Sequence, residues 1–448
     1  MTSFSKQRVL FNNEESTTND KLDLIITISR AVVSQWVGIL IYPESRSDFW
    51  VYRALAHYVA DFMMETIEPT FRIRDSFLAR TILWTRCDRD LDALTTIPFY
   101  LFDTWDDKMY FRREDYLGYQ AMTIIAMIHE IYNFEDTGSV LKHALMRWGR
   151  HEFGPSQSVM MHAMTKQNVN KMINDWSKMP GIPVIHVTLD RTEQYAELIQ
   201  ERFNPSGPWN SDQFTWTIPI RCYNLSSNEY YHHWMERERS LSMKAADIKN
   251  CLLNMSTFVP YRINYPESWW LEIIADLKEN PKNLSEMLKM RIIDDMLEFC
   301  VAGYIQISVI FDLLTYLSNE MDYFPWLAGA KALTKLRAIL GTTRIENYIS
   351  HFKQLTVNIV SNVYDWVEKE IATLPSPDDV KKNNDIMSHH YFRLHRKNIL
   401  NIACGFGHEK CLNDAESRLK CYVDEVSSDE CQNGNLKNLE RDSSLNMS

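Results

Sequence analysis

The sequence predicts a mainly α-helical protein with a small β-sheet region near its middle. Apolar residues recur at helical spacing in the first 185 residues and again from Pro266 onward. Between these parts, residues 186–258 alternate short apolar runs with turn clusters, which is typical of strands. Only 13 of the 448 residues are Gly, a composition that favours helices.

Composition indicates a folded globular protein with more than one domain. A chain of 448 residues leaves room for about two to four domains. Its hydrophobic content of 45% and charged content of 24% are ordinary for such proteins. The net charge of −11, without a basic patch, argues against a nucleic-acid partner. Eight cysteines are too few for a disulfide-dense scaffold.

The first helical stretch, residues 24–42, could be read as a buried helix or as a membrane anchor. Its length is close to the roughly 20 residues that span a bilayer. Arg30 would lie near its centre, however, at a cost of about 2.5–3.5 kcal/mol in the membrane. We therefore predict a buried helix and no membrane span.

Two segments in and after this stretch carry a resemblance to a known family. Residues 30–38 read Arg-Ala-Val-Val-Ser-Gln-Trp-Val-Gly, and residues 50–56 read Trp-Val-Tyr-Arg-Ala-Leu-Ala. They resemble the zinc helix, His-Glu-x-x-His-Gln-Trp-Phe-Gly, and the third-ligand segment, Trp-Leu-Asn-Glu-Gly-Phe-Ala, of the gluzincin aminopeptidases of the aminopeptidase N type. The resemblance places Arg30, Ser34 and Arg53 at the three ligand positions and Ala31 at the general-base position.

These replacements remove the chemistry that the family's motif supplies. Two His at i and i+4 lie on one face of a helix, and with a carboxylate they leave one zinc position open for water. A Glu then acts as general base on that water. A guanidinium has no lone pair to offer a metal. We therefore predict that this chain has no zinc cofactor, although its family uses one Zn²⁺.

Further landmarks keep the family's order along the chain. Tyr116, in Phe111-x4-Tyr116, would be the family's oxyanion-stabilising tyrosine, or else an ordinary half-buried helix tyrosine. Cys404 and Cys411 match a pair that forms a disulfide in secreted relatives. The remaining landmarks are stretches that match family segments: Phe11–Thr17, Trp176–Val187, Phe214–Ile220, Tyr261–Tyr265 and Pro325-Trp326.

The resemblance implies a domain layout. Residues 1–185 would be the helical part of a thermolysin-like catalytic domain, residues 186–258 a small β-sandwich, and residues 259–424 a truncated, solenoid-like helical domain. Residues 425–448 are polar and predict a disordered tail. The family's Gly-x-Met-Glu-Asn motif, whose Glu holds the substrate's α-amine, lies upstream of the zinc helix, and we expect it to be missing here.

The leading functional prediction is a catalytically inactive aminopeptidase-like protein. One alternative is a binding or regulatory module that engages peptides, an active aminopeptidase relative, or an anion held by Arg30 and Arg53. Asp48 and Glu114 are equally good internal partners for these arginines. Dimerisation through the C-terminal helices, as in the family, is a further alternative. An active zinc aminopeptidase is the least favoured, because function depends on the site and not on the fold.

The sequence also carries information on the compartment and on one group of histidines. The family is extracellular or attached to the plasma membrane, but the first residues lack an apolar signal core, so the chain as written predicts the cytoplasm. His389, His390 and His395 lack metal-binding spacing, and we predict that they line a solvated helix face.

Overall fold

Helices dominate the protein, with two small sheets at one end. The computed structural model describes residues 18–37, 49–83, 114–132, 167–179, 181–205, 207, 214–224, 229–249, 251–253, 259–341, 346–373 and 390–423. The predicted mainly α-helical class with a small β region is confirmed for this part of the chain. The predicted polar tail, residues 425–448, lies outside the described residues.

Helices come first along the chain. They are α2 (Thr18–Ser34), α3 (Phe49–Ile67), the 3₁₀ turn η2 (Pro69–Phe71), α4 (Ile73–Leu83), α6 (Glu114–Tyr132) and α9 (Gln167–Lys178). Their buried residues fall at helical spacing: on α4, for example, Ile73, Phe77 and Leu78 are buried. The helical reading of this part of the sequence is therefore confirmed where the structure describes it.

Strands follow and form two sheets. They are β1 (Pro183–Leu189), β2 (Tyr195–Arg202), β3 (Thr217–Asn224), β4 (Glu229–Glu236), β5 (Ser240–Lys244), β6 (Cys251–Leu253) and β7 (Arg262–Asn264), with the short helix α10 (Ala245–Lys249) after β5. The sheet orders are β5-β2-β1-β7 and β4-β3-β6. β1 pairs in parallel with β7, so the strands extend a few residues beyond the predicted range 186–258 on both sides.

A second set of helices completes the described chain. They are α11 (Glu267–Glu279), α12 (Glu286–Val301), α13 (Ile307–Thr315), η4 (Tyr316–Asn319), α14 (Tyr323–Gly341), α15 (Glu346–Thr373), α17 (His390–Phe406) and α18 (Glu409–Val423). Ser285 caps α12, because its hydroxyl accepts a hydrogen bond from the backbone N–H of Leu288 at 3.3 Å. α17 ends at Gly407, whose φ of 91° lets the backbone N–H of His408 reach the carbonyl of Ala403.

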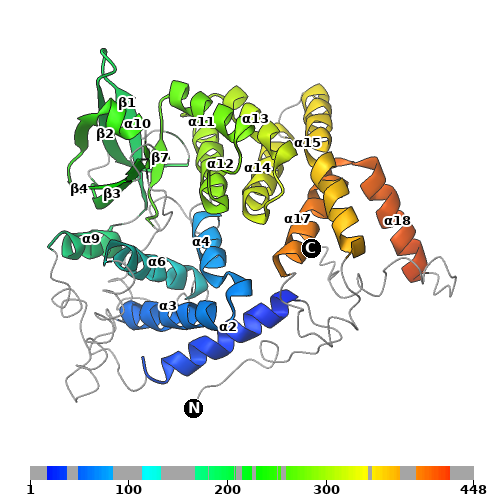
Figure 1. Ribbon diagram of the computed structural model, residues 1–448, viewed down its shortest axis with the longest axis horizontal. Coiled ribbons are helices and arrows are strands. Elements are labelled where there is room, and N and C mark those ends of the chain that lie inside the picture. The colour runs from blue at the N-terminus through cyan, green and yellow to red at the C-terminus, as the bar shows by residue number, and fades with distance from the viewer. Residues whose placement is uncertain are drawn as a thin grey trace.

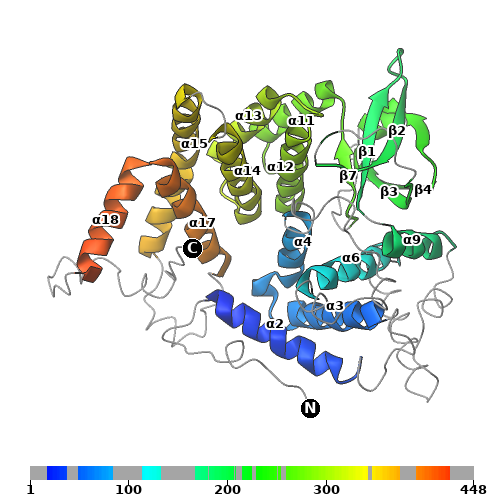
Figure 2. The same ribbon diagram turned by 180° about the vertical axis from the view of Figure 1, so that it is seen from behind.

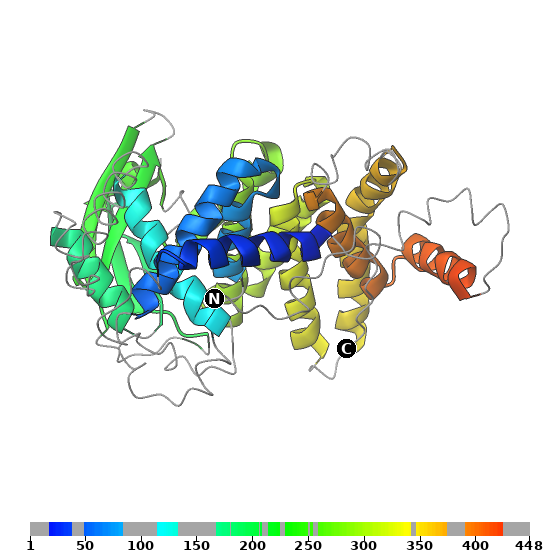
Figure 3. The ribbon, with the colours of Figure 1, turned by 90° about the horizontal axis from the view of Figure 1, so that it is seen from below.

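The sheets and the last helices lie at opposite ends of an elongated molecule. Figure 1 shows the sheets at one end and α15, α17 and α18 at the other, and Figure 2 shows the same order from behind. α4 packs on α3 and α6 on one side and on α12 on the other. Seen from below in Figure 3, α2 crosses the middle of the molecule toward α17. None of the described helices is long and apolar enough to cross a membrane.

Candidate functional site

α2 and α3 lie against each other and carry all four positions at which the resemblance places zinc chemistry. Val33 and Val37 are buried on the core side of α2, and Trp50 and Leu55 are buried on α3. Arg30 and Ser34 are one helical turn apart on α2, so they share a face. The packing of the two helices therefore fixes where these side chains point.

Arg30 is held by a carboxylate of the neighbouring helix. Its Nε donates to Oδ1 of Asp61 at 3.0 Å, and its Nη2 donates to Oδ2 at 2.7 Å. The side chains are 18% and 8% exposed, so water screens the pair only in part. Two parallel charge-assisted bonds of this kind are the strong form of an ion pair. α2 and α3 are therefore linked by an internal ion pair at the first ligand position.

The second ligand position and the base position offer nothing to a metal. The Ser34 hydroxyl donates to the carbonyl oxygen of Arg30 at 2.7 Å, so it bonds within its own helix. Ala31 has only a methyl group, which can neither bind nor accept a proton. Ala31 therefore has no lone pair to offer, and Ser34 offers only a neutral hydroxyl, which is a poor zinc ligand.

His57, one helical turn after Arg53 on α3, is affected by the charges of both arginines. Burial, Arg30 and Arg53 together lower the pKa of His57 to about 2, with burial the largest cause. Both guanidiniums therefore lie close enough to act on the same imidazole, although they come from different helices. The two guanidiniums, which add to the effect of burial on His57, also disfavour a divalent cation nearby.

The tyrosine expected to stabilise the oxyanion, Tyr116, lies in the first turn of α6. Its side chain is outside the described part of the structure. What joins α6 to α3 instead is a buried pair, in which the Tyr58 hydroxyl hydrogen-bonds Nδ1 of His129. Burial, and then Arg74, lower the pKa of His129 to about 4, so the ring is neutral at pH 7. The role of Tyr116 stays a prediction.

Two functional features of this site were missed by sequence reasoning. Asp61 was not among the carboxylates proposed as partners; Asp48 lies outside the described residues, and the side chain of Glu114 is not described. His57 lies one turn after Arg53, so helical spacing on α3 could have signalled that the two side chains share a face. Asp61 lies one further turn along, but only helix packing brings it to Arg30.

The described side chains contain no candidate metal centre elsewhere. No group of three or more His, Cys, Asp or Glu among them is arranged to hold an ion. Chemically, the α2–α3 pair offers two guanidiniums, a paired carboxylate and a neutral imidazole. This set suits charge pairing and does not suit activation of water by a metal.

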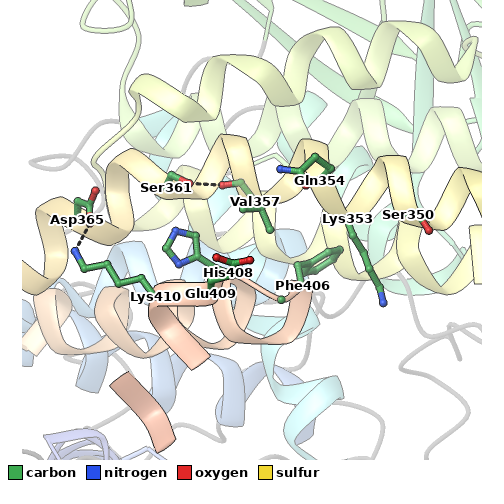
Figure 4. Close-up of a pocket in the computed structure, with 11 residues that line it drawn as sticks. Ser350, Lys353, Gln354, Val357, Ser361, Asp365, Phe406, His408, Glu409 and Lys410 are labelled. Carbon is green, nitrogen blue, oxygen red and sulfur yellow. Dashed lines mark hydrogen bonds and ion pairs between the residues drawn. The ribbon is translucent and has the colours of Figure 1, made fainter. Parts of the chain in front are cut away.

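A separate groove lies between α15 and the junction of α17 with α18. It encloses about 750 Å³. Figure 4 shows His408, Glu409 and Lys410 on one wall and residues of α15 on the other, with Lys410 paired to Asp365 at 2.6 Å. Cys404 and Cys411 form a disulfide beside it, the pair that the resemblance implies. Both partners of the Lys410 ion pair are mostly exposed, so the pair adds little stability.

Comparison with known proteins supports the resemblance that the sequence landmarks indicate. The ERAP1-like C-terminal domain family matches residues 251–438. Thyrotropin-releasing hormone-degrading ectoenzyme of Rattus norvegicus is 24% identical over 94% of this chain and 40% of its own length. Glutamyl aminopeptidase of Homo sapiens is 21% identical over 94% of this chain and 42% of its own, and aminopeptidase N of Rattus norvegicus 20% identical over 92% and 42%.

These likenesses define the class of protein. The chain is aminopeptidase-like, and its predicted resemblance to the aminopeptidase N type is confirmed. The chain spans about two fifths of the length of these relatives. Activities, substrates and partners of the whole relatives therefore come to this chain only as proposals.

Proposed function

We propose that this aminopeptidase-like protein does not catalyse peptide hydrolysis and serves as a pseudopeptidase that keeps the helical scaffold. The observation that carries the proposal is the bidentate ion pair between Arg30 and Asp61 at the first ligand position. A metal there would have to displace a guanidinium from its carboxylate and then tolerate the charge of Arg53. Both steps are unfavourable, and neither guanidinium can serve as a ligand.

The proposal includes a layout for the finer parts of the fold. Residues 1–185 would belong to the helical part of the catalytic domain, residues 186–258 would form a β-sandwich, and residues 259–424 would belong to the C-terminal helical domain. The parallel pairing of β1 with β7 supports a close connection between the second and third parts. Packing of α4 on α12 supports direct contact between the first and third.

Zinc analysis together with an aminopeptidase assay tests the proposed inactivity. We expect the purified full chain, supplied with Zn²⁺, to hold no stoichiometric zinc and to release no arylamine from aminoacyl-arylamide substrates. One equivalent of bound zinc with metal-dependent turnover would refute the proposal.

A restored variant provides the matched control. Arg30→His, Ala31→Glu, Ser34→His and Arg53→Glu together return the family's residues to the four positions. Because the helix pair would hold these positions in register, we expect this variant to gain zinc binding, measured by equilibrium dialysis, whether or not it gains activity. A folded variant that binds no zinc would contradict the proposed retention of the scaffold geometry.

A second candidate function is anion or acidic-peptide binding at the same helix pair. The joint action of Arg30 and Arg53 on His57 favours it, because it indicates a positive field. The pairing of Arg30 with Asp61 weighs against it, since an anion would have to compete with the Asp61 carboxylate for Arg30. Titration calorimetry with acidic peptides would decide: equal affinity for the wild type and Arg53→Ala would exclude this site.

In a regulatory role, the chain would bind an active relative through its C-terminal helices. Mass measurement by light scattering of the chain, alone and mixed with a candidate active aminopeptidase, tests it. A mixture that shows only the separate masses at micromolar concentration would contradict this role.

A further inference from the structure

α17 carries two histidines whose surroundings differ from those predicted. His390 is 0% exposed and His395 is 2% exposed, so the predicted solvated face is wrong for both; His389 lies outside the described residues. Among the described residues, none of their ring nitrogens has a hydrogen-bond partner. A buried imidazole in this state must be neutral, because its charged form would lose hydration without compensation.

Aromatic rings from three other elements surround these histidines. The ring of His390 lies 5.5 Å from that of Phe71 on η2, between centroids. The ring of His395 lies 6.2 Å from that of Tyr323 on α14 and 6.1 Å from that of Trp366 on α15. The two imidazoles therefore lie in the contact that attaches α17 to the rest of the molecule.

Tyr391 fixes the start of α17 at the same contact. Its hydroxyl donates to the carbonyl of Phe71 at 2.7 Å and lies 3.1 Å from that of Arg72. The guanidinium of Arg72 lies over the rings of Phe324 and Tyr391, at 4.7 Å and 5.5 Å. Arg72 also pairs with Asp75 and Glu286, at 2.8 Å and 3.1 Å. Arg72 is thus held between aromatic rings and two carboxylates at the start of α17.

The charged groups around the two histidines do not offer compensation for a proton on both. Arg393 on α17 opposes a charged His390, and Arg72 on the η2 side is already paired with Asp75 and Glu286. Asp322, before α14, favours a charged His395, but it also accepts a hydrogen bond from Lys289 at 3.0 Å. On the α15 side, Glu368 is paired with Arg396 and Arg418. Protonation would therefore introduce charge where partners are already taken.

Both imidazoles are hard to protonate in the folded protein. Burial and then Arg393 lower the pKa of His390 to about 4, and burial lowers that of His395 to about 4. In the unfolded chain both have the ordinary pKa of about 6.5. As the pH falls, the detached form therefore binds protons first. The contribution to stability is complete above about pH 6.5 and is lost progressively between about pH 6.5 and 4.

We propose that α17 is a pH-sensitive arm, which acidification detaches from η2, α14 and α15 by charging His390 and His395. The disulfide between Cys404 and Cys411 joins α17 to α18, so the two helices would move together. Detachment exposes Phe71, Tyr323 and Trp366, which form a new apolar surface. The proposal does not depend on whether the α2–α3 site is active.

Hydrogen exchange of the full chain tests the arm. Amide protection of residues 391–406 is measured at pH 7 and pH 5, corrected for intrinsic exchange rates, with α12 as internal reference. We expect the opening of α17 to increase on the order of 10-fold for each histidine, while α12 changes little. Unchanged protection of α17 at pH 5 would overturn the proposal.

Variants separate the histidines from other titrating groups. His390→Leu combined with His395→Leu should make α17 protection independent of pH over this range. His351→Gln, at an exposed position of α15, is the matched control and should keep the wild-type response. A response that persists in the double variant would assign the effect to carboxylates such as Glu286 and overturn the proposal.

A second measurement decides the case in which the double variant does not fold. The histidine side-chain signals of the wild type are titrated by NMR while α17 stays protected. Protonation midpoints well below 6.5 for His390 and His395 support the arm. Midpoints near 6.5 in the closed form would refute it, because charging would then cost nothing.

Discussion

Two regions of this protein hold helices together with opposite charges, but they do so in different surroundings. Between α2 and α3, Arg30 pairs with one carboxylate, Asp61, and Arg53 adds a second positive charge nearby. Between β7, α12 and α14, Arg262 pairs with Asp294 at 3.0 Å and also with Asp295, and Lys331 pairs with Asp294 at 2.6 Å. The Arg30–Asp61 pair is partly exposed, whereas Arg262, Asp294 and Asp295 form a buried network with Lys331 at its edge.

The two regions differ in the effect of removing one charged partner. Arg262 and Asp294 are 0% exposed, so removing either one takes a partner from a buried charge that water cannot reach. Arg30 is 18% exposed and can reach water if its partner is removed. We therefore expect the buried network to contribute more to stability than the α2–α3 pair. The α2–α3 pair neutralises a charge at a position where the resemblance predicts a zinc ligand.

The largest effect is expected from Asp294→Ala in the buried network. Arg262 and Lys331 would both lose a partner, and we expect the free energy of unfolding to fall by about 3–5 kcal/mol. Chemical denaturation followed by circular dichroism measures the loss. Asp294→Asn, which keeps the size but not the charge, is the control; a loss below about 1 kcal/mol for Asp294→Ala would place the network among weak surface pairs and remove the contrast.

An intermediate effect is expected from Asp61→Ala. Two charge-assisted hydrogen bonds disappear and Arg30 is left without Asp61, so stability should fall by about 1.5–3 kcal/mol. Arg30→Met combined with Asp61→Leu should recover most of the loss, because it removes both charges. The same denaturation experiment compares all three proteins. If the single variant is as stable as the wild type, the pair does not link the helices.

The smallest effect is expected from Ser34→Ala. Among the described residues, the Ser34 hydroxyl donates to the carbonyl oxygen of Arg30, within the same helix. Ala also favours helix, so we expect a change within about 0.5 kcal/mol. Thermal unfolding of this variant beside Asp61→Ala gives the comparison. A loss as large as that of Asp61→Ala would mean that Ser34 has a structural role beyond its own helix.

Periodicity predicted most of the helices, because local spacing is a property of the sequence itself. The apolar stretches Trp269–Leu277 and Ile305–Leu317 fall within or overlap α11 and α13, and residues 345–367 fall almost entirely within α15. The strand region was placed to within a few residues. The pairing of β1 with β7 was not predictable, since it joins segments nearly 80 residues apart.

The contacts at the candidate site could not be predicted from the sequence. The assignment of Arg30, Ser34 and Arg53 to the ligand positions depends on retained flanking residues and spacing, and it stays a prediction. The partner Asp61 depends on how α2 lies on α3. The burial of His390 and His395 depends on η2, α14 and α15, which no window along α17 contains.

One contact also limits the order in which the protein can assemble during synthesis. The amine of Lys331 donates a hydrogen bond at 2.9 Å to the carbonyl oxygen of Leu83, which is the last residue of α4. The last carbonyl groups of a helix have no hydrogen-bond donor within that helix. This hydrogen bond can form only after residue 331 has left the ribosome. The direct link between α4 and α14 therefore forms late in synthesis, after the whole of α12 has been made.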